Sequence, residues 1–145
     1  MKYFADAPES RGRSMKKTHI VIGILLFIVF VITGRLMRID FPDKGEIPQD
    51  FRILMRSRHI YILLSALLHL LLGAYLRLHS ERRVKIVQFA ASFILIISSS
   101  LFVAAFFLET YTYQHFSDVS RYAIYSALAG AVLHVLTAIV PSPAE

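Results

Sequence analysis

The chain has 145 residues, of which 56% are hydrophobic and only 18% are charged. A mean hydropathy of +0.57 excludes a soluble globular domain and a disordered chain, and the length suits a single domain in a lipid bilayer. The formal charge of +6 favours contact with anionic lipid headgroups and requires no nucleic-acid partner. There are no cysteines, which excludes disulfides, thiolate metal sites and covalently attached haem.

Residues 1–17 form a basic segment ahead of the first apolar run. We expect this segment to be a flexible tail, and Met15, which precedes two lysines, is as good a start site as Met1. The first run is predicted to cross the membrane at residues 18–38. A basic turn follows it where a signal peptide would have its cleavage site, so the run should remain as an uncleaved anchor.

The other three apolar runs are predicted to cross the membrane at residues 57–78, 84–108 and 119–140. Each is long enough for a hydrocarbon core of about 30 Å. Residues 48–57 carry proline and aspartate where a helix begins, which predicts that the second helix extends out of the membrane. Pro141 ends the fourth helix and leaves a short tail at 141–145. Short connections favour an all-α, up-down antiparallel bundle of four transmembrane helices.

The distribution of Lys and Arg indicates how the chain sits in the membrane. Five of these residues precede the first span, six lie around the first connection, four around the second and one in the third. With the amino terminus in the cytoplasm, nine lie inside and seven outside. The third connection is aromatic and nearly free of positive charge, as is typical of an outer interface. We therefore expect a protein of a bacterial inner membrane with both termini in the cytoplasm.

Ionisable residues deep inside the spans are the candidates for a functional site, because they are costly in hydrocarbon. All ten acidic residues lie outside the predicted spans or at their ends, which argues against a proton-coupled transporter or an ion pump. Two histidines remain, His69 in the second span and His134 in the fourth. Both have a glycine one turn away, Gly73 and Gly130 respectively, so both should point into the bundle.

Two neutral imidazoles from different helices can ligate a b-type haem from opposite sides. The sequence therefore makes His69 and His134 candidate axial ligands of haem b. Candidate partners for the haem propionates are three basic residues near the same end of these spans: Arg77, Arg82 and Arg83.

The alternative to haem is a structural role for the two deep histidines. Each would make a hydrogen bond between helices, with its partner among three serines of the third span: Ser98, Ser99 and Ser100. Such a bond contributes on the order of 0.6 kcal/mol.

The remaining histidines are weaker candidates: His19, His59 and His79 at span ends, and His115 in the third connection. His59 is the best placed of these because Arg56 and Arg58 precede it, and the three groups together suit an anionic headgroup, a quinone or a phosphate.

Glu109 and Arg121 flank the third connection and are expected to pair across it, contributing at most about 1 kcal/mol. The sequence contains no phosphate-binding glycine loop, His-Glu-x-x-His, Gly-x-Ser-x-Gly or EF-hand motif. We therefore expect a non-enzymatic accessory or interaction subunit. Its partner would be a second copy or another membrane protein, met through small faces such as Ser126-x-x-x-Gly130 or Ala127-x-x-x-Ala131. The alternative function is that of a membrane electron carrier with haem b.

Overall fold

The computed structural model describes residues 7–41, 45, 47–112 and 118–141, and the regular structure within these ranges is helical. Four helices follow one another: α1 (Ala7–Asp40), α2 (Gln49–Tyr75), α3 (Arg82–Tyr111) and α4 (Asp118–Ala138). Each is long and apolar enough to cross a membrane. The prediction of an all-helical protein with four membrane-length helices is therefore confirmed.

Two helices extend beyond their predicted spans. α1 begins at Ala7, so part of the segment that we expected to be a flexible tail is helical. α2 begins at Gln49, directly after Pro48, which confirms that this helix extends ahead of residue 57. Proline suits that position because a helix start has no hydrogen-bond partner for the missing N–H. α4 ends at Ala138, ahead of Pro141.

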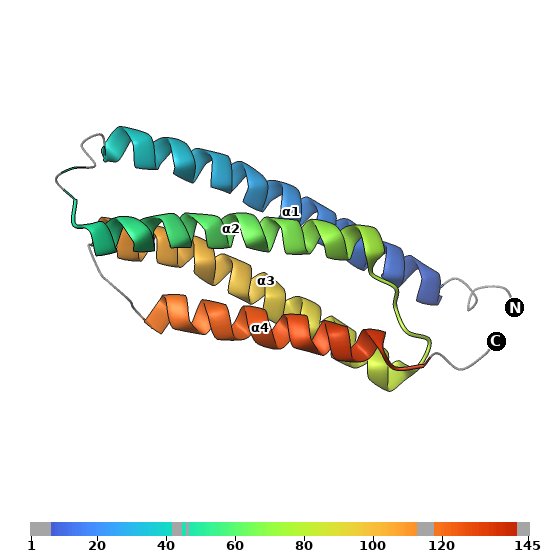
Figure 1. The fold of residues 1–145 in the computed structure, drawn as a ribbon. Helices are drawn as coiled ribbons and strands as arrows, with labels where there is room; N and C mark the ends of the chain where they lie inside the picture. Colours follow the sequence, from blue (N-terminus) through green and yellow to red (C-terminus); the bar gives the residue numbers. More distant parts are fainter. Residues whose placement is uncertain (1–6, 42–44, 46, 113–117, 142–145) are drawn as a thin grey trace, which may run out of the picture.

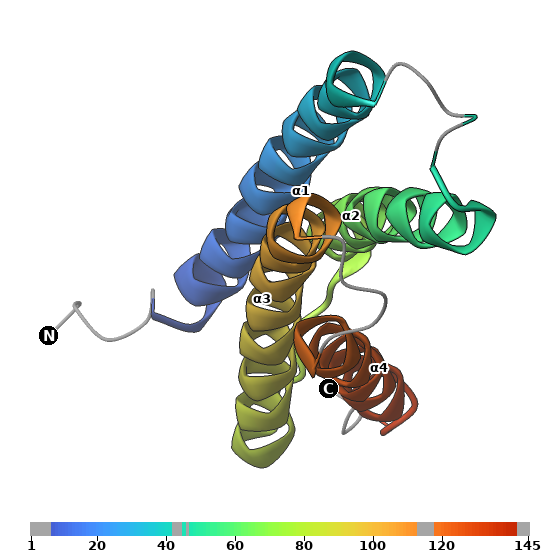
Figure 2. The same cartoon turned by 90° about the vertical axis from the view of Figure 1, so that its left-hand side faces the viewer.

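The helices pack as two pairs, α1 with α2 and α3 with α4, and contacts between α2 and α3 join the pairs. The α1/α2 pair lies above the α3/α4 pair in Figures 1 and 2. The start of α1, the end of α2, the start of α3 and the end of α4 lie together at the right of Figure 1. We call this the histidine end, because the buried residues His19, His69 and His134 lie in this half. The opposite end, where α1 ends and α2 begins, is called the arginine end.

Glycines allow the two helices of each pair to approach closely. A Cβ atom at Gly73 of α2 would lie 2.4 Å from Cγ1 of Ile20 and 3.0 Å from the Ile20 backbone nitrogen in α1. A Cβ atom at Gly130 of α4 would lie 2.7 Å from Cγ of Leu95 and 3.1 Å from the Ala91 carbonyl oxygen in α3. Because Gly130 packs inside the chain, the glycine of the Ser126-x-x-x-Gly130 motif contacts α3 and does not face a second copy.

Replacing Gly73 by alanine is expected to lower the free energy of unfolding by about 1–3 kcal/mol. The new methyl group would press on the backbone of α1, which cannot move aside as a side chain can. Gly12→Ala is the matched control, because its Cβ would meet only the flexible end of Leu78, at 3.3 Å. Unfolding in mixed micelles, followed by circular dichroism, measures both changes. Equal stability of the two variants would contradict the close α1/α2 contact.

Apolar side chains cover the outside of the bundle, whereas polar side chains collect inside it. Large apolar residues are exposed on all four helices, for example Val31, Leu64, Phe93 and Val135. The polar residues that are buried include histidines, serines, an arginine and a glutamate. This distribution is the reverse of that in a soluble protein and is typical of a bundle surrounded by lipid.

Candidate functional site

The two histidines singled out in the sequence, His69 and His134, both lie inside the bundle. Their exposed fractions are 1% and 8%, as the small residues around them predicted. They do not form a simple pair, because a third imidazole, that of His19 in α1, joins them. Nδ1 of His19 lies 2.7 Å from Nδ1 of His69, and the centre of the His19 ring lies 6.3 Å from that of His134.

Two serines of α3 complete the arrangement, which we call the histidine cluster: His19, His69, Ser92, Ser99 and His134. Oγ of Ser92 lies between two imidazoles, 3.0 Å from Nε2 of His19 and 3.1 Å from Nε2 of His134. Oγ of Ser99 lies 2.9 Å from Nε2 of His69. The cluster therefore connects all four helices through hydrogen bonds between side chains.

The donor and acceptor of each of these hydrogen bonds follow from one further bond, between the Ser99 hydroxyl and the backbone. The Ser99 hydroxyl donates to the carbonyl oxygen of Leu95 at 2.8 Å, so its oxygen accepts from His69 Nε2 and from the Ser65 hydroxyl, the latter at 2.6 Å. With Nε2 as the donor, Nδ1 of a neutral His69 has no proton. It must accept from the Nδ1–H group of His19.

The same reasoning continues on the other side of His19. With its proton on Nδ1, neutral His19 has a bare Nε2, which accepts from the Ser92 hydroxyl. The Ser92 oxygen then accepts from Nε2 of His134. All donors point the same way, from His134 toward Leu95, so each bond polarises and strengthens the next. Three neutral imidazoles are thus accommodated inside the bundle without a counter-charge, and such a chain can also pass a proton between its ends.

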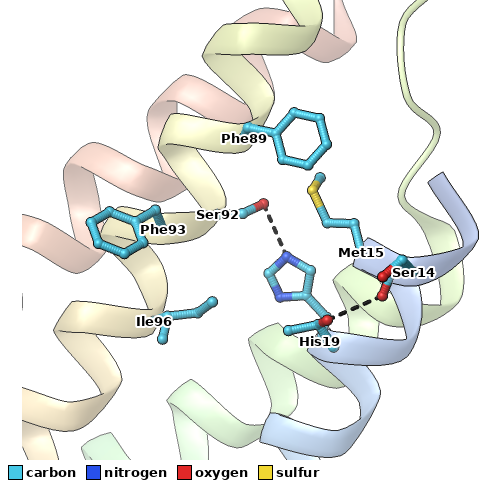
Figure 3. A pocket seen from close by; sticks show the side chains of 8 residues that line it. Ser14, Met15, His19, Phe89, Ser92, Phe93 and Ile96 are labelled. Atoms are coloured by element: carbon cyan, nitrogen blue, oxygen red, sulfur yellow. Dashed lines mark hydrogen bonds between the residues drawn. The ribbon is translucent and has the colours of Figure 1, made fainter. Parts of the chain in front are cut away.

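Two hollows reach the histidine cluster from outside. One, of about 580 Å³, lies between α1 and α3 and is lined by His19, Ser92 and apolar side chains that include Phe89 and Phe93. Figure 3 shows the His19 ring pointing toward Ser92 beside this hollow. Its volume is within the range of small-molecule sites, and its wall is mainly apolar.

The second hollow, of about 690 Å³, is lined by His134 and by residues at the end of α2. Arg77 lines it, so the structure brings one of the three predicted propionate partners near His134. Arg82 and Arg83 are exposed at the start of α3 and do not line it. His79 does line it, and Nε2 of His79 lies 3.3 Å from the Pro141 carbonyl oxygen.

His19 and Ser92 are the site residues that the sequence analysis missed. His19 stands at the edge of the predicted first span, which made it look like an interfacial residue. Its spacing was the available signal, because Met15, His19 and Gly23 recur every four residues and all three are buried. The serine partners were identified in part: Ser99 binds His69 as expected, but His134 binds Ser92, outside the Ser98 to Ser100 run.

A buried ion pair between α2 and α3 lies toward the arginine end. Nε of Arg58 in α2 donates to Oε2 of Glu109 in α3 at 2.7 Å. The same carboxylate accepts from the backbone nitrogen of Ser120 at 3.0 Å and from its hydroxyl at 2.5 Å. Glu109 thus has partners on α2 and α4 that the sequence did not reveal. Arg121 is exposed, and its Nη1 lies 3.6 Å from Oδ1 of Asp118.

His59 lies toward the same end of the bundle as Arg58 but has a different environment. Its Nδ1 lies 3.0 Å from the hydroxyl of Thr33 in α1, and its ring stacks on Phe30 with centres 4.1 Å apart. Arg58, which the sequence grouped with His59 as an anion-binding residue, is instead turned inward to Glu109. His115 lies outside the described residues.

Within the described ranges, no three His, Asp or Glu side chains are arranged as ligands of one metal ion. Comparisons with protein-family models, with curated proteins and with solved structures found no match.

Proposed function

We propose that this chain is an integral protein of a bacterial inner membrane. Its four helices would cross the bilayer in up-down order, with the histidine end and both termini on the cytoplasmic side. The Lys and Arg distribution supports this orientation, since nine of the sixteen lie on that side. The outward-facing apolar side chains of all four helices support contact with lipid.

Reporter fusions test this topology. A reporter in the third connection is expected to be active outside the cytoplasm, and one fused after Glu145 is expected to be active inside it. The reverse pattern would overturn the orientation. Two reporters on the same side would overturn the up-down order.

We propose that the protein acts as a non-enzymatic membrane subunit, working through association with a second copy or another membrane protein. The observation that carries this proposal is that both nitrogens of His19 and both of His69 are engaged within the chain. Imidazoles bound in this way hold helices together and present no free nitrogen to a substrate. The histidine cluster would then fix the shape of the bundle that a partner meets.

Single cysteines test the association, because the natural chain has none. Cysteines replacing Val31 on α1 or Leu128 on α4, both exposed, are expected to give a crosslinked product of defined mass in native membranes. Ala123→Cys, at a position that is 0% exposed, is the matched control and should give none. Absence of crosslinking from both outer positions, together with a monomer in mild detergent, would overturn the proposal.

The second candidate function is a b-type haem electron carrier. It is favoured by the way Nε2 of His19 and Nε2 of His134 face one hydroxyl, with the two rings inclined at 75°. Each imidazole nitrogen would lie about 2 Å from a metal that it ligates. If Ser92 turned aside, these two nitrogens would face a common point. This geometry favours His19 with His134 as the ligand pair. The pair that the sequence suggested, His69 with His134, would require His69 to give up its bonds to His19 and Ser99.

The spectrum of protein purified from haem-replete cells tests this candidate. A sharp reduced-minus-oxidised haem band is expected, and it should be lost in His134→Ala. Loss of the band in His69→Ala but not in His19→Ala would identify His69 and His134 as the ligands. The opposite result would identify His19 and His134. His59→Ala, outside the cluster, is the control that should retain the band. A colourless protein would overturn the haem proposal and leave the accessory role untouched.

A further inference from the structure

A small pocket at the arginine end gathers positive charge from two helices. It has a volume of about 190 Å³ and lies between the end of α1 and the start of α2. Its polar lining comes from Arg38 of α1 and from Arg52, Arg56 and His59 of α2. We call these four residues and the space between them the arginine pocket. None of the described residues that line it is acidic.

The buried part of Arg52 is the most informative feature of this pocket. The Nε atom of Arg52 is buried and has no hydrogen-bond partner among the described residues. A buried donor without a partner costs free energy. An anion in the pocket would supply the acceptor. Arg52 stands one turn into α2, whose start has no side-chain cap and carries Asp50 in its first turn.

Two charged residues close to the pocket in the sequence, Asp40 and Arg58, have partners elsewhere. Arg58 is turned inward and pairs with Glu109. Asp40 accepts a hydrogen bond from the hydroxyl of Tyr111 at 2.5 Å and does not line the pocket. Among the described residues, the pocket is therefore lined by three arginines and by no acidic group.

His59 is held in place beside these arginines. The Thr33 hydroxyl donates to the Phe30 carbonyl oxygen at 3.0 Å, so its oxygen accepts from the Nδ1–H of His59. The ring edge that carries Nε2 lies against Gly34, where an added Cβ would be 3.3 Å from Nε2. Glycine at this position lets the ring lie close to α1.

Part of the pocket lining is apolar. Phe41 and Met55 line it, and together with Phe51 they form a small buried cluster between α1 and α2. Apolar surroundings lower the local polarity, which strengthens the attraction between a guanidinium group and an anion.

We propose that the arginine pocket binds a phosphate group. Guanidinium groups match phosphate oxygens in forked geometry, and several of them can share one doubly charged anion. The pocket lies at the end of two membrane-length helices, the level at which lipid headgroups occur. The phosphate can belong to an anionic lipid or to a soluble phosphate compound, and both present the same chemistry to the arginines. This inference is independent of the histidine cluster and of either function proposed for it.

Two probes test the site and separate the two sources. Purified protein is incubated with inorganic phosphate, and bound phosphate is measured by equilibrium dialysis. In parallel, protein reconstituted in phosphatidylcholine with or without phosphatidylglycerol is examined by native mass spectrometry for retained lipid. Retention of phosphatidylglycerol without dialysis binding would identify a lipid headgroup, and phosphate binding that displaces the lipid would identify a site open to soluble phosphates.

Arg52→Gln, Arg38→Gln and Arg56→Gln are each expected to weaken binding about tenfold, as the loss of one charge-assisted hydrogen bond would. Arg35→Gln is the matched control, because Arg35 is an exposed arginine of the same helix end that does not line the pocket. It is expected to change binding less than about twofold. Equal weakening by Arg35→Gln would show general attraction to surface charge and overturn the proposal, as would absence of binding to both probes.

Thermal unfolding distinguishes loss of the site from loss of the fold. Arg52→Met removes the buried unpaired donor, so without phosphate this variant is expected to unfold at the same temperature as the parent or higher. Adding inorganic phosphate or phosphatidylglycerol should raise the unfolding temperature of the parent but not of Arg52→Met. A variant that is less stable without anion, or that gains the same stabilisation, would contradict the assignment of Arg52.

Discussion

Replacing Glu109 by leucine is expected to lower the free energy of unfolding by about 3–5 kcal/mol. The side chains of Arg58 and Glu109 are 4% and 0% exposed, so neither charge can recover its solvation when the other is removed. The change would also remove the acceptor of the Ser120 hydroxyl and backbone nitrogen at the start of α4. Unfolding by SDS in mixed micelles, followed by circular dichroism, measures the loss.

The double variant Arg58→Leu/Glu109→Leu is the decisive comparison. It leaves no buried charge without a partner, so it is expected to be more stable than Glu109→Leu and to recover most of the lost free energy. Arg121→Gln, which affects an exposed pair with Asp118, should change stability by no more than about 1 kcal/mol. If the double variant were as unstable as the single one, the buried ion pair would not be the cause.

Replacing His19 by alanine is expected to lower the free energy of unfolding by about 2–3 kcal/mol, from two interhelical hydrogen bonds and a cavity. His19 lies in the middle of the donor chain, between His69 and Ser92. Its removal would leave the Ser92 hydroxyl without its acceptor and Nδ1 of His69 without its donor, both in the interior. The same unfolding measurement in mixed micelles tests this.

Two variants separate hydrogen bonding from packing at His19. His19→Phe fills the space without replacing either hydrogen bond, and is expected to lose most of what alanine loses. Thr18→Ala is the local control, because the Thr18 hydroxyl is exposed and bonds only to the Ser14 carbonyl oxygen of its own helix. Full stability of His19→Phe would show that packing alone matters there and would contradict the hydrogen-bonded chain.

The Arg58–Glu109 ion pair and the histidine cluster both include a residue of α2, which explains how a small bundle can hold both. On α2, residues 58, 62, 65, 69 and 73 are all buried, with spacings of three or four residues. This stripe turns Arg58 toward Glu109 and His69 toward the histidine cluster. A change that rotated α2 would therefore disturb the ion pair and the histidine cluster together.

Local sequence patterns determined much of this fold. Runs of apolar residues predicted four membrane-length helices, because a helix must satisfy its own backbone hydrogen bonds in lipid. Small residues one turn from His69 and His134 predicted that both point inward, since close helix contacts require small side chains. Proline and aspartate at 48–57 predicted that the second helix starts early, and α2 does begin at Gln49.

Only the tertiary structure decided which polar groups meet. The partners of His19 lie 50 and 73 residues away in the sequence, and Arg58 lies 51 residues from Glu109. Periodicity shows which face of a helix is buried, but it does not give the rotation and depth of one helix relative to another. Those are set by contacts such as Gly73 with Ile20 and Gly130 with Leu95. Each histidine could therefore be placed inside the bundle from its own neighbours, whereas the cluster required all four helices to be docked.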